Sequence, residues 1–114
     1  MLDRKNRLTK KSEFEKVKEE GKVIASDSFS VSVLDRKDGK PTRFGFIVST
    51  KISKAATIRN RVKRALREAV RHLVAYVKEG YDCVIFVKPI IVKKYTDEIM
   101  REVQKAFMKG NLMD

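Results

Sequence analysis

The sequence predicts an α+β fold: a sandwich in which helices cover a small sheet, in the order α-β-β-α-β-α. Residues 28–33 alternate between serine and apolar side chains, as in a strand with one buried face. Residues 83–87 form an uninterrupted apolar run, typical of a central strand covered on both faces. Residues 58–78 and 95–109 carry apolar side chains at helical spacing. With 114 residues, 42% of them hydrophobic, the chain suits one domain, residues 1–114, with one modest core.

The first predicted element is a short amphipathic helix over residues 9–20, "TKKSEFEKVKEE". Phe14 and Val17 lie three residues apart, on one side of this helix. Thr9 or Ser12 is the candidate N-cap, because a short hydroxyl side chain accepts a hydrogen bond from the free amides of a first turn.

Two predicted strands follow, over residues 23–34 and 43–50, separated by the turn sequence "DRKDGKPT". Each strand has one apolar face and one face of mainly small side chains. The apolar faces hold Phe29, Val31, Val33, Phe44, Phe46 and Val48, and the small faces hold Ser28, Ser30, Ser32, Gly45, Ile47 and Ser49. We expect the two strands to pair as an antiparallel hairpin, because turn residues connect them directly.

A long helix is predicted over residues 58–78, with Thr57 as its N-cap. The strand "YDCVIFVKP" then covers residues 81–89 and stops at its proline. The final helix covers residues 95–109, with Thr96 as its N-cap. The expected buried stripes are Val62, Ala65, Leu66, Ala69, Val70 and Leu73 in the long helix, and Ile99, Val103, Ala106 and Phe107 in the final helix.

Net charge indicates a polyanionic partner. The chain has 27 Lys and Arg against 15 Asp and Glu, a formal charge of +12. This excess favours nucleic acid first and an anionic membrane surface second. No apolar run has the ~20 residues of a membrane span, and the N-terminus has no stretch of signal-peptide type, so we expect a cytoplasmic protein with no membrane partner. A single cysteine, Cys83, excludes an internal disulfide.

The positive charge is concentrated on the long helix. Residues 51–71 hold eight Lys or Arg and one acid, Glu68. A solvated helix surface usually interleaves acids with its cations, whereas Arg64, Arg67 and Arg71 are neighbours that repel one another. Further cations, Arg59 and Arg61, lie near the helix N-terminus, where the helix dipole disfavours positive charge. This arrangement is unfavourable unless the face meets phosphate groups, so we interpret it as a nucleic-acid contact rather than a solvated surface.

The stretch "RNRVKRALREA" resembles the Arg-Asn-Arg signature of the bacterial ribonuclease P protein component. "NRLTKKSEFEKVKEEGK" is similar to the opening of that family, and "RFGFIVSTKISKAATIRNRVKR" to its second strand, basic loop and signature helix. "YDCVIFVKP" is similar to its later strand. The resemblance covers roughly residues 4–108.

The resemblance implies an α/β sandwich with a left-handed β-α-β crossover. It also implies a partnership with a catalytic RNA subunit, which uses Mg²⁺ to remove the 5′ leader of precursor tRNA. The protein would bind that RNA and hold the leader between its sheet and its first helix. The metal would be held mainly by the RNA subunit and the substrate.

Two sets of site residues follow. Arg59, Asn60, Arg61, Lys63, Arg64 and Arg67 match the signature that faces the RNA subunit, and Arg71 continues their row. Phe14, Lys18, Ser30, Ser32, Ser49 and Lys51 are expected at the leader. Some relatives carry aromatic residues where this chain has Lys18 and Ser32, which implies weaker leader stacking here. No protein residue is expected to be catalytic or to bind a metal.

Three alternatives come from other functional classes. A ribosomal or assembly protein could use a similar fold and basic helix to bind ribosomal RNA. A stand-alone nuclease is disfavoured, because the sequence shows no cluster of carboxylates for a two-metal site. DNA binding through a helix-turn-helix is disfavoured as well, because no short second helix accompanies the basic one.

Overall fold

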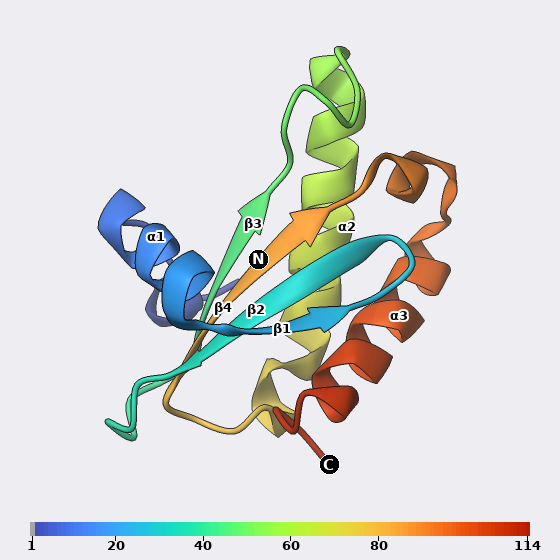
Figure 1. The fold of residues 1–114 in the computed structure, drawn as a ribbon. Coiled ribbons are helices and arrows are strands. Elements are labelled where there is room, and N and C mark those ends of the chain that lie inside the picture. The colour runs from blue at the N-terminus through green and yellow to red at the C-terminus, as the bar shows by residue number, and fades with distance from the viewer. Residues whose placement is uncertain (1) are drawn as a thin grey trace.

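The computed structural model describes residues 2–114, which fold around one four-stranded sheet (Figure 1). Helices α2 and α3 cover one face of the sheet, and α1 lies on the other. The strands are β1 (Lys22–Ala25), β2 (Phe29–Asp35), β3 (Arg43–Ile47) and β4 (Tyr81–Val87), and the helices are α1 (Lys11–Glu20), α2 (Ala56–Leu73) and α3 (Thr96–Lys109). Short 3-10 helices are η1 (Arg4–Asn6), η2 (Val74–Tyr76) and η3 (Pro89–Lys93).

Strand pairing differs from the predicted hairpin. The sheet order is β1-β2-β4-β3, so β4 lies between β2 and β3. Strand β4 is antiparallel to β2 and parallel to β3. The apolar run of β4 explains this position, because the most hydrophobic strand gains most from cover on both faces. The prediction that residues 23–34 and 43–50 pair with each other is therefore wrong.

The antiparallel hairpin lies within residues 23–34, which were predicted to be one strand. Its two arms are β1 and β2, joined by a tight connection at Ser26–Ser28. The carboxylate of Glu102 on α3 accepts hydrogen bonds from the Ser26 hydroxyl (2.5 Å) and the Ser28 amide (2.8 Å). A side chain 74 residues away thus holds this turn, which is why local alternation could not reveal it.

The connection from β3 through α2 to β4 is left-handed. In Figure 1 both strands run upward, α2 lies behind the sheet, and β4 lies to the right of β3. A right-handed crossover, the usual form, would place β4 on the other side. The handedness implied by the family resemblance is therefore present.

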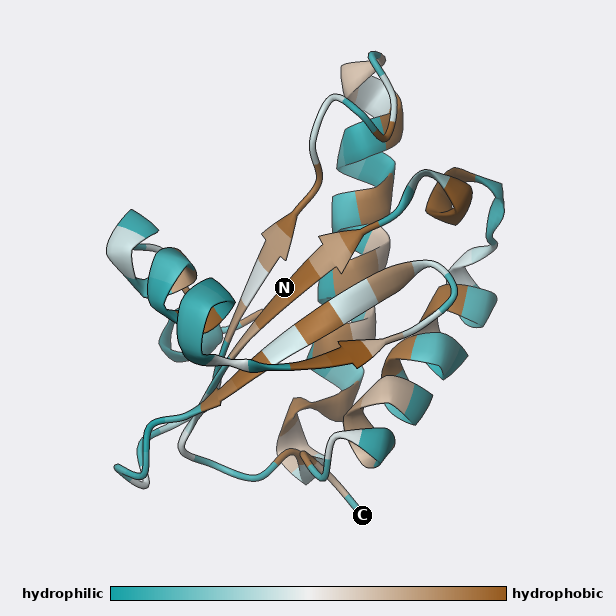
Figure 2. Cartoon of the chain, viewed as in Figure 1, coloured by the Kyte–Doolittle hydropathy of each residue, from teal (hydrophilic) through white to brown (hydrophobic). Residues whose placement is uncertain are grey.

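The predicted core stripes are confirmed. All six apolar residues expected on α2 and all four on α3 are buried, and they pack beneath the sheet. The rings of Phe44 and Phe107 stack with centroids 5.6 Å apart, which joins β3 to α3. Figure 2 shows hydrophobic residues along the strands and hydrophilic ones on the outer sides of the helices.

Helix ends differ from the predictions by a few residues. The N-caps are Lys10, Ala55 and Tyr95, rather than the expected hydroxyl residues. In α1 and α3 a glutamate in the first turn makes the capping contact instead. The Glu13 carboxylate accepts from the Lys10 amide (3.2 Å), and Glu98 accepts from the Tyr95 amide (3.1 Å). Helix α2 ends at Leu73, earlier than expected, and continues as η2.

Candidate functional site

The cationic face of α2 follows directly from its packing. Because the apolar stripe faces the sheet, the residues between its members turn outward. Asn60, Arg61, Arg64, Arg67 and Arg71 are exposed, and Arg59 and Lys63 are half-buried beside them. We call these seven residues the α2 cationic face. All the RNA-subunit residues predicted from the sequence thus lie on one surface.

The six cations of this face differ in the partners that the protein gives them: one forms an ion pair, two donate to backbone carbonyls and three have no ion pair among residues 2–114. Arg71 pairs with Glu68 and holds the pKa of that carboxyl at about 2, so the pair is neutral overall at pH 7. Arg59 donates to the Ser53 carbonyl (2.8 Å), and Arg61 donates to the Val92 carbonyl (2.9 Å), which leaves their charges unneutralised.

Lys63, Arg64 and Arg67 form no ion pair with any residue in the range 2–114. These three side chains are neighbours on α2, at spacings of one, three and four residues. Their mutual repulsion costs stability unless an anion lies between them. The arrangement therefore suits a phosphate-bearing ligand.

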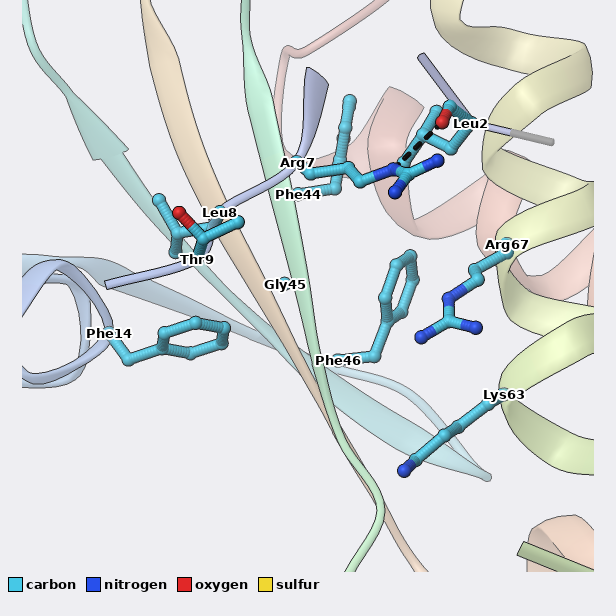
Figure 3. A pocket seen from close by; sticks show the side chains of 10 residues that line it. All are labelled: Leu2, Arg7, Leu8, Thr9, Phe14, Phe44, Gly45, Phe46, Lys63 and Arg67. Carbon is cyan, nitrogen blue, oxygen red and sulfur yellow. Dashed lines mark hydrogen bonds between the residues drawn. The ribbon is translucent and has the colours of Figure 1, made fainter. Parts of the chain in front are cut away.

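A cavity of about 310 Å³ lies between the N-terminal segment, α1, the β3 edge and α2 (Figure 3). Lys63 and Arg67 extend from α2 toward Phe46, and Phe14 lies on the other side of β3, beside Gly45. The cavity is lined by Leu2, Arg7, Leu8, Thr9, Phe14, Phe44, Gly45, Phe46, Lys63 and Arg67. The cavity joins the cationic face of α2 to the aromatic residue of α1.

The ring of Phe14 occupies the space that a side chain at Gly45 would fill. A Cβ atom added to Gly45 would overlap Cε1 and Cζ of the Phe14 ring. The ring therefore lies directly on the backbone of β3, and it remains half-buried. Phe14 thus has packing contacts as well as an accessible part.

Helix α1 covers one cross-strand row of its sheet face and leaves the next row open. The covered row, in register across the sheet, is Val23, Ser32, Val84 and Gly45. Ser32 is only 3% exposed, and Val84 and Gly45 are also buried. Only the edge residue of this row, Val23, is open. Ser32, expected at the leader, therefore offers almost no surface in this structure.

The open row consists of Ala25, Ser30, Phe86 and Ile47, in register across all four strands. Ala25 and Ile47 are exposed, and Ser30 and Phe86 are half-buried. Sequence reasoning named Ser30 but missed Phe86, because its place in an apolar run concealed which face it occupied. Lys18, Ser49 and Lys51, the remaining predicted leader residues, are exposed.

Other reactive groups lie outside these surfaces. Cys83 is fully buried in β4, and this burial raises the pKa of its thiol, so a reactive thiolate is disfavoured. Across residues 2–114, no three His, Cys, Asp or Glu side chains are grouped so that they could hold a metal ion. No helix in that range combines the length and the apolar character required to cross a membrane.

Comparison with known proteins identifies the family. The family model described as "Ribonuclease P" matches residues 2–110. The ribonuclease P protein component of Symbiobacterium thermophilum is 36% identical over 107 residues, covering 94% of this chain and 92% of the relative. This chain belongs to the ribonuclease P protein family. The Synechocystis component is 33% identical over 108 residues, covering 95% and 87% of the two chains.

Solved structures of ribonuclease P proteins share the fold. The RNase P protein of Staphylococcus aureus has a TM-score of 0.87 at 22% identity, covering 96% of this chain and 98% of that one. The protein from Thermotoga maritima has a TM-score of 0.81 at 22% identity, covering 90% and 96%. The family resemblance and the α+β fold class are therefore both confirmed.

Proposed function

We propose that this chain is the protein subunit of a ribonucleoprotein that removes the 5′ leader from precursor tRNA. Membership of the ribonuclease P family implies a part in tRNA processing. The observation that carries the proposal further is the group Lys63, Arg64 and Arg67, three adjacent cations with no acidic partner among residues 2–114. Structured RNA supplies closely spaced phosphates that would relieve their repulsion.

The α2 cationic face is the proposed contact for the RNA subunit. Guanidinium groups form two parallel hydrogen bonds with a phosphate, which suits the predominance of arginine here. Asn60 lies between Arg59 and Arg61, where its amide could bond a base edge or a 2′-hydroxyl group. Arg71 is the weakest member of the set, because Glu68 already accepts its hydrogen bonds (3.2 Å from Nε).

The open row beside α1 is the proposed contact for the leader. A single strand is bound through aromatic stacking together with a basic groove. Phe86 and part of Phe14 offer ring surface, and Ser30 offers a hydroxyl group. Lys18 and Lys51 supply positive charge nearby. Of the two β2 serines predicted at the leader, Ser30 is accessible, whereas Ser32 would require a shift of α1.

The donor set of residues 2–114 does not fit a Mg²⁺ ion held by the protein alone, because it contains no suitable cluster of acids. We propose that the Mg²⁺ required for cleavage is held by the RNA subunit and the substrate phosphates. The protein residues would then bind and orient RNA, and no protein side chain is assigned a proton transfer or a nucleophilic step.

Cleavage of precursor tRNA tests this function. A bacterial ribonuclease P RNA is incubated at low Mg²⁺ with a 5′-labelled precursor, with and without this protein. We expect the protein to stimulate release of an intact leader, to stimulate more for a long leader than for a single-nucleotide leader, and to cut nothing alone. Tight binding to other structured RNA without any stimulation would instead favour a ribosomal or assembly role.

A further inference from the structure

An exposed tyrosine stands where η3 meets α3. Tyr95 is 76% exposed, more than any other large hydrophobic side chain of residues 2–114, and Ile90 in η3 is 47% exposed. The two residues before Tyr95 are Lys93, which is exposed, and Lys94, which is half-buried. Most of the Tyr95 ring is therefore open to a partner, and two lysines precede it in the chain.

The junction is fixed in place against α2. Ile91 of η3 is fully buried, and the Arg61 guanidinium donates to the Val92 carbonyl (2.9 Å). Tyr95 is therefore attached to a rigid segment that one residue of the α2 cationic face holds directly. A rigid aromatic side chain loses little conformational entropy when it binds a partner.

The neighbours of Tyr95 line the same grooves as the arginines. Thr96 borders an open groove of about 500 Å³ together with Arg61, Arg64, Ala65, Arg67 and Glu68. Lys94 and Thr96 also border a narrow gap with Arg61. The α2 cationic face and the η3–α3 junction thus form the two sides of one continuous groove.

Charge around this groove favours an anionic occupant. Glu68 is neutralised by Arg71. Asp97, next to Thr96, lies 3.4 Å from Arg101. Arg64 and Arg67 on one side of the groove, and Lys94 on the other, form no ion pair with residues 2–114. Lys93, next to Lys94 in the chain, forms none either. Exposed aromatic surface with flanking cations matches an unpaired base with its adjacent phosphates.

We propose that the interface with the RNA subunit continues from α2 across this groove onto the η3–α3 junction, where Tyr95 stacks on an unpaired base. Lys93 and Lys94 contact the phosphates on either side of that base. This inference rests on the proposed function, since it names a further contact with the same RNA. It assigns to the start of α3 a role that the signature sequence of α2 does not include.

Fluorescence tests the stacking directly. The chain contains no tryptophan, so Tyr95→Trp places a single indole at the junction. The matched control is Tyr76→Trp in η2, beyond the C-terminal end of α2, where the tyrosine is 70% exposed. On titration with ribonuclease P RNA, we expect strong quenching for Tyr95→Trp and little change for Tyr76→Trp. Equal responses at the two positions would overturn the proposal.

Affinity gives a second, independent readout. Tyr95→Ala is expected to weaken binding of the RNA subunit roughly 5- to 150-fold, the range for loss of one stacked base, with an unchanged salt dependence. Tyr95→Phe should bind like the unaltered protein, because stacking needs the ring and not the hydroxyl. Tyr76→Ala should have no effect.

The outcomes separate the inference from the proposed function. If the unaltered protein fails to bind ribonuclease P RNA, the proposed function fails. If it binds and Tyr95→Ala binds equally well, only the stacking contact is refuted. A loss that Tyr95→Phe shares would also refute stacking, because it would point to the hydroxyl group.

Discussion

At the scale of single residues, the pair Phe14 and Gly45 shows how a glycine positions an aromatic ring. Strand β3 approaches α1 closely only because residue 45 has no side chain. The ring consequently lies over the backbone of β3, at the border between the cavity beside α2 and the sheet face beneath α1. A glycine inside a strand weakens the strand. At residue 45 this cost is offset by the close contact between the Phe14 ring and the β3 backbone.

Gly45→Ala should displace Phe14. Alanine improves the strand by about 0.5–1 kcal/mol, but forcing a methyl group into packed space costs about 1–3 kcal/mol, so a net loss of stability is expected. Gly45→Ala should also bind precursor tRNA more weakly than the unaltered protein does. The two proteins should bind mature tRNA equally well. Equilibrium unfolding in urea and filter binding measure the two effects.

The double variant Phe14→Leu/Gly45→Ala provides the control for that prediction. If the clash with the ring is the cause, the leucine should recover most of the stability that Gly45→Ala loses, giving a non-additive cycle. Additive losses would show that the alanine acts through another contact.

At the scale of elements, α2 combines a buried stripe with the α2 cationic face. The buried stripe alone is enough to pack α2 against the sheet, and ordinary polar residues could fill its outer side. The outer side instead carries Lys63, Arg64 and Arg67 without acidic partners among residues 2–114. Repulsion among these cations therefore lowers the intrinsic stability of α2, and a bound anion would relieve that repulsion.

Arg64→Ala tests this surface. We expect weaker binding to ribonuclease P RNA and a plot of log affinity against log salt that is shallower by about one unit, the value for one lost phosphate contact. Lys109→Ala in the last turn of α3 is the control, because Lys109 is also an exposed cation but lies outside the proposed contacts. Should both variants show the same salt dependence as the unaltered protein, α2 would not be the phosphate contact.

At the scale of the whole molecule, a chain of ion pairs connects α1 to both β3 and β4. Arg43 binds Asp82 through two hydrogen bonds (2.8 and 2.7 Å) and also binds Glu13 on α1 (2.5 Å). Arg36 lies 3.4 Å from the same Asp82, which is only 3% exposed. These bonds to the two carboxylates raise the pKa of Arg43 despite its partial burial. The orientation of α1 over the sheet depends on this chain.

Arg43→Gln should destabilise the fold and alter its response to acid. Asp82 would keep only the longer contact with Arg36, at a cost of about 3 kcal/mol for a broken buried pair. Burial alone would raise the pKa of Glu13, but hydrogen bonds from Arg43 and the Lys10 amide lower it below 4.5. Ionised Glu13 therefore stabilises the fold above pH 4.5, and this contribution is lost as the pH falls through the lowered value.

The free energy of unfolding, measured in urea from pH 7 to pH 3, checks both parts. The unaltered protein should lose stability below pH 4.5, and Arg43→Gln should show a shallower loss over the same range. Arg101→Gln breaks only an exposed pair and should change the free energy by less than about 0.5 kcal/mol. An identical acid response in all three proteins would contradict the role of Arg43.

Local sequence patterns were enough to predict the helices, the buried stripes of α2 and α3, the central character of β4 and the α2 cationic face. Each depends on periodicity or composition within one segment, which local chemistry controls. The sequence also carried the family resemblance, through residues 59–69 above all.

Three-dimensional packing was needed to establish the strand order, the turn held by Glu102, the burial of Ser32 and the open row that includes Phe86. The tertiary structure also places Thr96, the residue after Tyr95, in the same groove as Arg61 and Arg64. These features bring together segments that are far apart in the chain. Which segments meet depends on the arrangement of all elements that buries the most apolar surface. Alternation along a strand shows that it has two faces, but the helix that covers each face is chosen by the whole fold.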